Sequence, residues 1–245
     1  MEIAAIVVAA GLGRRMGGAA KALLELCGKP LLCHSLDLFQ SSPLVDGIVV
    51  AVPPGTLSFF RDEFASRWRH PKVLAWVAGG ARRQDSAAAA LAAVPPEASI
   101  VAVHDAARPC ASAGLVRRVI EAAKRSGAAI PAVEVVDTIK EVDEAGVVTR
   151  SPARERLRAV QTPQAFSAGL LREAYRAAGD GRRAATDDAS LVERLGRPVV
   201  VVEGERGNIK ITVPEDLGAA EAILKGRMGG GAAPGRAGPG PRIST

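Results

Sequence analysis

Ile3-Ala4-Ala5-Ile6-Val7-Val8-Ala9-Ala10 runs directly into Gly11-Leu12-Gly13-Arg14-Arg15-Met16-Gly17-Gly18-Ala19-Ala20-Lys21. The first eight residues form an apolar run of strand length, which is typical of a strand buried on both faces of a parallel sheet. The glycines that follow predict a tight turn in which backbone N–H groups can approach an anion closely. Arg14, Arg15 and Lys21 add mobile positive charge at the same place. This stretch therefore predicts a binding site for a phosphorylated ligand.

The rest of the chain alternates strand patterns with helix patterns. Strands are expected over residues 48–52, 73–77, 100–103, 129–133 and 199–202, and helices over 31–40, 57–67, 81–93, 115–125, 168–178, after Asp188 and from 215 to about 224. This alternation predicts a doubly wound α/β fold with a mostly parallel, Rossmann-like sheet. In such folds ligands bind outside the carboxyl edge of the sheet.

A different pattern interrupts this alternation after residue 135. Two short polar strand patterns, at 138–142 and 147–150, flank Asp143-Glu144-Ala145-Gly146 and predict a β-hairpin. A lone hairpin is marginal in water, so residues 136–153 are expected to form a protruding arm that packs on a second subunit.

The domain organisation follows from composition. Residues 1–225 are expected to form a single domain that includes the arm, and the Gly-, Pro- and Arg-rich residues 226–245 a disordered tail. Thr212 and Glu215 have the spacing of a capping box at the start of the last helix.

Composition also argues against several classes of protein. The chain has 245 residues and a formal net charge of +6, with only 3% aromatic residues. Because Arg227, Arg236 and Arg242 lie in the expected tail, the remainder is only weakly basic, and we expect no nucleic-acid partner. The three cysteines include no CxxC pair and are expected to be reduced thiols. No apolar run is long enough to span a membrane, so we expect a soluble, cytoplasmic protein.

Two common nucleotide-binding motifs fit the first loop poorly. Gly11 and Gly13 could begin a dinucleotide fingerprint, but Met16 holds the place of the third glycine. The second strand ends in Pro53-Pro54, without the acid that would bind a ribose. A Gly-Lys-Ser/Thr sequence is absent, which excludes a P-loop ATPase.

Four further motifs are expected at the carboxyl edge of the sheet. They are Gly79-Gly80 with Arg83, Asp85 and Ser86; His104-Asp105-Ala106-Ala107-Arg108-Pro109; Thr162-Pro163-Gln164; and Gly207-Asn208-Ile209-Lys210. Each has a structural interpretation, such as an ordinary turn, a surface cation or, for His104, a buried core histidine. The recurrence of cations and Asp105 at strand ends favours one shared site instead.

Together these motifs resemble those of the 2-C-methyl-D-erythritol 4-phosphate cytidylyltransferases, a family of sugar-phosphate nucleotidyltransferases in the non-mevalonate isoprenoid pathway. The resemblance covers residues 3 to about 224 in order and includes the motifs at 137–140, 186–190 and 208–212. It implies a sheet of the nucleotide-diphospho-sugar transferase type and transfer of CMP from CTP to methylerythritol phosphate, with release of pyrophosphate. Ala20 and Ala81 depart from the family pattern, which usually has a proline and an acid at these positions.

The resemblance also implies roles for individual residues. Arg15, Lys21, Arg154 and Lys210 would be catalytic. Nucleotide binding is implied for Ala9, Ala10, Gly11, Gly13, Gly79, Gly80, Arg83, Ser86, Asp105 and Ala106. Acceptor binding is implied for Arg108, Thr138, Arg154, Thr162, Thr186 and Lys210. Asp105 would be the candidate ligand of a divalent cation, Mg²⁺, on the triphosphate, and the arm would join two subunits in a homodimer.

Two alternative functions stay open at this point. A sibling enzyme with the same fold and CTP site would use D-ribitol 5-phosphate as acceptor. A non-catalytic nucleotide-binding protein could keep the fold without turnover. Retention of Arg154 and Lys210 argues against the second alternative, because a sensor needs no cations for a second substrate.

Overall fold

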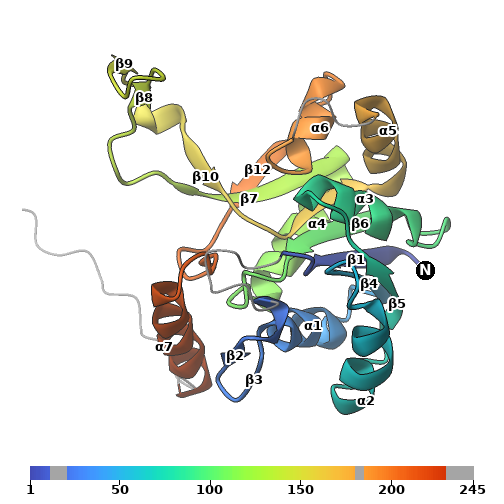
Figure 1. The fold of residues 1–245 in the computed structure, drawn as a ribbon. Coiled ribbons are helices and arrows are strands. Elements are labelled where there is room, and N and C mark those ends of the chain that lie inside the picture. The colour runs from blue at the N-terminus through green and yellow to red at the C-terminus, as the bar shows by residue number, and fades with distance from the viewer. Residues whose placement is uncertain (12–20, 180–184, 230–245) are drawn as a thin grey trace, which may run out of the picture.

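The computed structural model describes residues 1–11, 21–179 and 185–229. Its main sheet has the strand order β10-β7-β11-β6-β1-β4-β5, and β12 also pairs with β7 (Figure 1). The apolar run that opens the chain forms β1 (Ile3–Val8), which lies between β4 (Gly47–Val52) and β6 (Ile100–Asp105) and is parallel to both. β5 (Val73–Ala78) continues the parallel set beyond β4. The predicted doubly wound, mostly parallel fold is confirmed.

The order of the strands reverses at β1. The chain adds β4 and β5 on one side of β1 and then crosses to β6 on the other side. The carboxyl ends of β1 and β6 therefore border a topological switch point, which is the usual ligand site of such sheets. Val8, the last residue of β1, is in register with Asp105, the last residue of β6. The loops that follow these two strands thus begin as direct neighbours.

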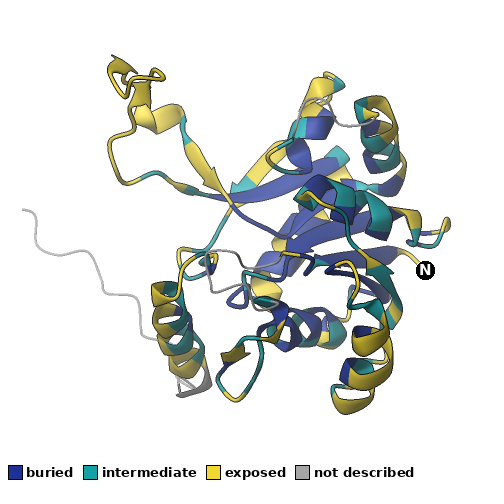
Figure 2. Ribbon diagram, in the orientation of Figure 1, coloured by how far each residue is buried: buried dark blue, intermediate teal, exposed yellow. Residues whose placement is uncertain are grey.

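Helices cover both faces of the sheet. The side chains of β1 alternate between two core clusters, as the period of a strand requires. One cluster contains residues of α1 (Leu31–Ser41) and α4 (Ala113–Ser126). The other contains residues of α3 (Arg83–Ala92), α5 (Ala168–Ala178) and α6 (Ala189–Arg194). The sheet is accordingly buried between two helical layers (Figure 2).

The sequence pattern missed part of the sheet. β11 (Gln164–Ser167) lies antiparallel between β6 and β7 (Ala128–Glu134), and β10 (Arg158–Val160) is antiparallel to β7. Both strands are short and lack an apolar run, so only their place between longer strands identifies them. β12 (Val200–Glu203) pairs with β7 in parallel, close to its expected position.

Two smaller regions also differ from expectation. The predicted helix at 57–67 consists of a π-helical segment, Phe59–Phe64, and the short α2 (Ala65–Arg67). Phe60 and Phe64 both contact Trp76 of β5, with ring centroids 5.8 Å away in each case. After the 3-10 turn Lys21–Leu23, a small hairpin of β2 (Glu25–Leu26) and β3 (Lys29–Pro30) precedes α1.

The predicted arm is a hairpin that projects from the body (Figure 1). β8 (Glu141–Val142) and β9 (Val148–Arg150) pair antiparallel, and Glu141 forms an ion pair with Arg150 across them. In the turn, Gly146 has a φ of +80°, and the Asp143 carboxylate accepts from the backbone N–H groups of residues 145 and 147. This turn chemistry is what the Asp-to-Gly segment predicts.

The last helix, α7 (Glu215–Gly229), is longer than predicted and has a different cap. Asp216, rather than Glu215, accepts from the Thr212 backbone N–H and hydroxyl. The helix passes the expected end near Leu224, and Arg227 donates to the Cys110 carbonyl at 2.6 Å. The helix thus extends past the expected start of the tail at 226. Residues 230–245 lie outside the described residues, and their disorder stays a prediction.

Two further expectations concern the cysteines and membrane-spanning helices. The three cysteines are all unpaired, as expected for reduced thiols. In the described part of the chain, none of the helices combines the length and apolar character needed to cross a membrane.

Candidate active site

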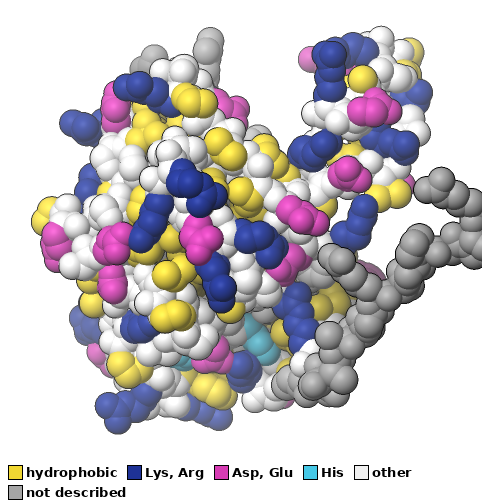
Figure 3. Space-filling model, turned by 180° about the vertical axis from the view of Figure 1, so that it is seen from behind, with side chains coloured by type: hydrophobic (Ala, Val, Ile, Leu, Met, Phe, Trp, Pro, Cys, Tyr) yellow, Lys and Arg dark blue, Asp and Glu magenta, His cyan; other side chains and the backbone are white. Residues whose placement is uncertain are grey.

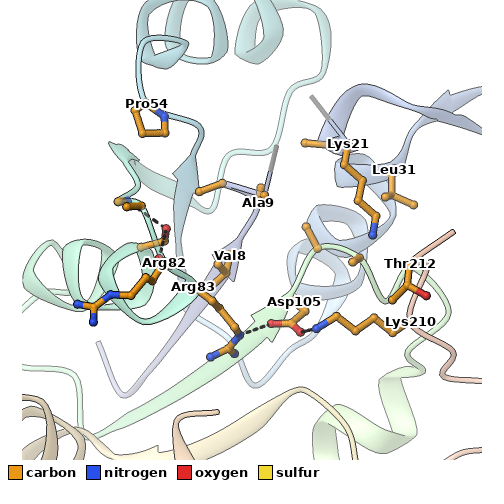
Figure 4. Close-up of a pocket in the computed structure, with 18 residues that line it drawn as sticks. Val8, Ala9, Lys21, Leu31, Pro54, Arg82, Arg83, Asp105, Lys210 and Thr212 are labelled. Atoms are coloured by element: carbon orange, nitrogen blue, oxygen red, sulfur yellow. Dashed lines mark hydrogen bonds and ion pairs between the residues drawn. The ribbon is translucent and has the colours of Figure 1, made fainter. Parts of the chain in front are cut away.

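A cavity of about 680 Å³ opens at the switch point between β1 and β6 (Figure 4). Ala9, Ala10 and Gly11 line it directly after β1, and Asp105 and Ala106 line it at the end of β6. Its volume is in the range of small-molecule sites in proteins. The loop expected to cradle phosphates thus borders a cavity of the size that a nucleotide needs.

A second cavity, of about 260 Å³, adjoins the first. Its own lining includes Arg108, Thr162, Gln164, Thr186 and Asp187. The two cavities share three lining residues, which are Arg83, Asp105 and Lys210. We call these three residues the shared wall. Two ligands bound in the two cavities would meet at this wall.

Asp105 is the electrostatic centre of the shared wall. Its Oδ1 accepts from Arg83 Nε at 2.7 Å, and its Oδ2 accepts from Lys210 Nζ at 2.7 Å. Burial opposes ionisation of this carboxyl, but the charges of Arg83 and Lys210 outweigh that effect and hold its pKa well below its usual range. Asp105 is therefore ionised and neutralises part of the positive charge of both cations.

A hydrogen-bonded chain of buried groups fixes the backbone around Asp105. The Thr162 hydroxyl accepts from the Asp105 backbone N–H at 3.0 Å and lies 3.2 Å from His104 Nδ1. His104 Nε2 lies 3.2 Å from the Arg108 carbonyl, which can only accept, so we assign the ring proton to Nε2. Burial lowers the pKa of His104 to about 4. The structural interpretation of His104, a neutral core histidine, is the correct one.

The loop that carries Lys210 is tied to the ends of β6 and β11. The Asn208 amide donates to the Thr162 carbonyl at 2.9 Å, and Arg108 Nη1 donates to the Asn208 carbonyl at 2.7 Å. The Ile211 backbone N–H donates to the Ala107 carbonyl at 2.8 Å. The Lys21 ammonium donates to the Ile211 carbonyl. These bonds bring Lys21 and Lys210 to one cavity although 189 positions separate them in the printed sequence.

Two glycines follow β5: Gly80 lines the larger cavity, and Gly79 packs behind Ala10 and Ser86. A Cβ atom on Gly79 would lie 2.4 Å from Ala10 Cβ and 2.7 Å from Ser86 Oγ. The Gly80 backbone N–H donates to Ser86 Oγ at 3.1 Å. Only glycine at residue 79 permits this close approach of the β1 loop and α3.

The side chains present suit a divalent cation only if the nucleotide supplies most of its ligands. Among the described residues that line the larger cavity, Asp105 is the one acidic side chain. The described residues also contain no cluster of three or more His, Cys, Asp or Glu side chains that could hold a metal. One carboxylate combined with substrate phosphates is a usual environment of Mg²⁺. Asp105 is therefore the one described acidic side chain here that a nucleotide-bound Mg²⁺ could use, in competition with Arg83 and Lys210 for its two oxygens.

The structure brings together most of the residues implied by the family resemblance. Those at the larger cavity are Ala9, Ala10, Gly11, Lys21, Gly80, Arg83, Ser86, Asp105, Ala106 and Lys210. Those at the smaller cavity are Arg83, Asp105, Arg108, Thr162, Thr186 and Lys210. Gly79 lies behind Ala10 and Ser86 rather than in the lining.

Three described residues with implied roles, Gly79, Thr138 and Arg154, line neither cavity. Gly13 and Arg15 lie outside the described residues. Thr138 lies in the arm and Arg154 directly follows it. Both are exposed, and Arg154 Nη1 donates to the Val136 carbonyl at 2.6 Å. Arg154 opens a 3-10 turn, Arg154–Arg156, and lines neither cavity of its own chain.

Sequence reasoning assigned no individual role to several residues that line the site. Pro54, Arg82, Ala107 and Thr212 also line the larger cavity, and Gln161, Gln164 and Asp187 the smaller one. Most of them stand inside the quoted motifs or next to a residue with an implied role. More residues of each motif therefore line the cavities than the resemblance implies. Tyr175 and Asp188 lie behind Arg83. Asp188 falls in the motif at 186–190 but has no implied role in the site, and Tyr175 belongs to none of the motifs.

Comparisons with known proteins agree on one family. The family model described as 2-C-methyl-D-erythritol 4-phosphate cytidylyltransferase matches residues 3–226. The enzyme of that name from Pelotomaculum thermopropionicum is 47% identical over 93% of this chain and 96% of its own length. The one from Symbiobacterium thermophilum is 48% identical over 92% of this chain and 94% of its own length.

Solved structures give the same result. The crystal structure of 2-C-methyl-D-erythritol 4-phosphate cytidylyltransferase from Thermus thermophilus is 42% identical and has a TM-score of 0.75, covering 92% of this chain and all of that one. That of 4-diphosphocytidyl-2C-methyl-D-erythritol synthase from Anaerococcus prevotii is 32% identical and has a TM-score of 0.80, covering 91% of this chain and 96% of that one.

Proposed function

The chain belongs to the 2-C-methyl-D-erythritol 4-phosphate cytidylyltransferase family, and from this membership we propose that CTP occupies the larger cavity and the acceptor the smaller one. The protein is a nucleotidyltransferase that transfers CMP from CTP to 2-C-methyl-D-erythritol 4-phosphate in isoprenoid biosynthesis. The relatives named above are enzymes that use methylerythritol phosphate. They favour this activity over the ribitol phosphate and non-catalytic alternatives.

The shared wall is the observation that carries the mechanism. A phosphate oxygen of the acceptor forms a bond to the α-phosphorus of CTP, and the bond from that phosphorus to the β-phosphate oxygen breaks. The nucleophile is already an anion, so no general base is needed. The main barrier is the approach of two anions, and cations at their meeting point lower it. Lys210 and Arg83 line both cavities and suit that role.

Lys21 would act from the nucleotide side of the wall. Its ammonium is held by the Ile211 carbonyl, next to the loop of Lys210, and it lines the larger cavity only. We assign it the charge that develops on the α-phosphate in the transition state. Arg15 would assist there, and its role stays a prediction because it lies outside the described residues.

Mg²⁺ is the expected cofactor. Asp105 would hold it together with oxygens of the triphosphate. The ion would neutralise charge on the leaving pyrophosphate. Through its two ion pairs, Asp105 also holds Arg83 and Lys210 in place on the shared wall.

A pyrophosphate-release assay tests the function. Each nucleoside triphosphate is supplied with Mg²⁺ and either methylerythritol phosphate or ribitol phosphate. We expect release with CTP and methylerythritol phosphate. Release with ribitol phosphate alone would move the assignment to the sibling enzyme, and no release under any pairing would reject catalysis.

We further propose a homodimer joined by the arms. The arm stands clear of the body in space-filling view (Figure 3). Its apolar side chains Val136, Val142, Val147 and Val148 are each more than half exposed. An isolated hairpin gains little stability in water, so a partner surface would stabilise it. Arg154 would then reach the acceptor cavity of the partner.

Complementation between two inactive variants tests this arrangement. Arg154→Ala and Lys21→Ala should each be inactive alone. If Arg154 acts in the partner, a mixed dimer has one intact site, and random mixing restores about a quarter of wild-type activity. No recovery in subunit-exchanged mixtures, or a monomer by sedimentation, would contradict the proposal.

A cytoplasmic location is part of the proposal. The three unpaired thiols suit a reducing compartment. Cell fractionation with a periplasmic marker enzyme as control would test the location.

A further inference from the structure

A buried chain of polar groups extends behind the shared wall. The Tyr175 hydroxyl on α5 donates to Asp188 Oδ1 at 2.5 Å. The other oxygen of Asp188 lies 2.8 Å from Arg83 Nη2. Neither Tyr175 nor Asp188 lines either of the two cavities, and the Asp188 side chain is only 1% exposed. We call Tyr175, Asp188 and Arg83 the relay.

The relay fixes two edges of one guanidinium group. Arg83 Nε is bound to Asp105 and Arg83 Nη2 faces Asp188, so the planar group is held between two carboxylates. A guanidinium paired on two edges cannot rotate about its terminal bonds without losing one partner. A single carboxylate would leave Arg83 free to turn away from the wall.

The relay also sets the charge balance of the wall. Asp105 forms ion pairs with two cations, Arg83 and Lys210. Asp188 forms an ion pair with Arg83. With Asp188 present, the charges of Arg83, Lys210, Asp105 and Asp188 cancel. Without it, the wall carries an excess positive charge, and both cations depend on Asp105 alone.

Tyr175 has the properties of a fixed donor to this carboxylate. Burial and the nearby Asp188 charge hold the pKa of Tyr175 far above its usual range, so the hydroxyl keeps its proton. Its hydrogen bond satisfies the Asp188 oxygen that Arg83 does not face. This bond therefore holds the carboxyl group in the orientation in which its other oxygen faces Arg83.

We propose that Asp188 and Tyr175 are positioning residues for the cytidylyl transfer and act only through Arg83. They hold its guanidinium at the boundary of the nucleotide and acceptor cavities. This inference rests on the proposed function, since it assumes that substrates meet at the shared wall. A purely structural role for the pair in packing α5 and α6 is the competing explanation.

A double-mutant cycle separates the two explanations. Tyr175→Phe keeps the ring and removes the donor, and we expect kcat/KM to fall about fivefold to tenfold, with Asp188→Asn lower still. In an Arg83→Gln background, Tyr175→Phe should cause no further loss, because the residue through which it acts is gone. Additive losses would overturn the proposal.

Val192→Ala is the matched control. Val192 is a buried core residue of α6, the helix that Asp188 precedes, and it has no part in the relay. This variant should lower the unfolding temperature and leave kcat/KM unchanged. A loss of activity in Val192→Ala equal to that of Tyr175→Phe at matched unfolding temperatures would support mere packing and overturn the proposal.

A spectroscopic readout tests the relay without turnover. Tyr175 is the only tyrosine of the chain, so protein labelled with ¹³C at the tyrosine Cζ gives a single resonance. Arg83→Gln should shift that resonance, because the Asp188 charge loses its cation. An unchanged resonance would overturn the relay even if the enzyme assay fails. A shifted resonance in a protein without pyrophosphate release would leave the relay intact and reject only the proposed function.

Discussion

The Nζ atom of Lys210 lies 2.7 Å from Asp105 Oδ2, although the two residues are 105 positions apart in the chain. The other oxygen of Asp105 binds Arg83 Nε at the same distance. One carboxylate therefore holds two cations beside each other at the boundary of the two cavities. Two anionic substrates that meet there find positive charge already in place, which reduces the reorganisation that the reaction requires.

Asp105→Asn should lower the stability of the fold as well as the rate of the reaction. The variant keeps the shape of the side chain but removes the charge between Arg83 and Lys210, which then repel. Because Asp105 is almost fully buried, we expect a loss of about 3 kcal/mol in urea unfolding. Asp62→Asn, an exposed member of a pair with Arg61, is the control and should leave the midpoint nearly unchanged. Equal midpoints for the two variants would contradict the central role of Asp105.

Lys21→Ala should affect turnover much more than CTP binding. If Lys21 stabilises charge that develops on the α-phosphate, kcat should fall about 100-fold or more, while the Kd for CTP changes less than about threefold. Single-turnover kinetics and calorimetry measure the two quantities. Lys29→Ala removes a cation that pairs with Asp37 outside both cavities, and should be nearly silent. Parallel losses in kcat and affinity would mean that Lys21 holds the ground state.

Gly79→Ala should damage the nucleotide cavity. The new methyl group would overlap Ala10 Cβ and Ser86 Oγ, so the β1 loop and α3 must move apart. We expect KM for CTP to rise about tenfold and stability to fall by roughly 1–3 kcal/mol. The control is Gly169→Ala in α5, where a Cβ atom meets nothing within 4 Å. That variant should gain up to about 1 kcal/mol from helix propensity. Normal CTP kinetics in Gly79→Ala would show that the close approach is dispensable.

Arg108→Ala should weaken binding of the acceptor and leave binding of CTP nearly unchanged. Arg108 lines the smaller cavity but not the larger one, and it also binds the carbonyls of Asn208 and Val160. We expect KM for methylerythritol phosphate to rise about 10- to 100-fold, with KM for CTP changed less than about threefold. Arg118→Ala, which loses an ion pair with Glu205 outside both cavities, should leave both KM values unchanged. An equal rise in both constants would argue against two separate subsites.

His104→Gln should flatten the pH dependence of stability. The buried imidazole has a pKa of about 4, below the 6.5 of the exposed group, so protons favour the unfolded chain. Its contribution is complete above pH 6.5 and is lost as the pH falls towards 4, by roughly 3 kcal/mol in all. Urea unfolding of both proteins from pH 7 to 4 measures the difference. Burial also lowers the pKa of His34, but both proteins retain that residue. Parallel curves would show that His104 is not buried in neutral form.

Local sequence was enough to predict the main elements. The run Ile3–Val8 is uninterrupted and apolar, so it had to be a strand covered on both faces. Gly127, with a φ of +82°, ends α4 just after the expected end of that helix at residue 125, as a C-cap glycine does. The Asp143-to-Gly146 turn likewise specifies its own hairpin. In these cases the deciding interactions lie between residues a few positions apart, so the local sequence is enough to predict them.

Local sequence could not predict the pairings that build the shared wall. β11 has no strand signal of its own and forms because β6 and β7 present unpaired edges to it. Arg83 meets Asp105 and Asp188, which come from two other regions of the chain. Motifs at strand ends therefore indicated which residues could belong to a site. Only the packing of helices on the sheet decided which of them touch, because ion pairs depend on distances of a few ångströms between segments that the chain order leaves far apart.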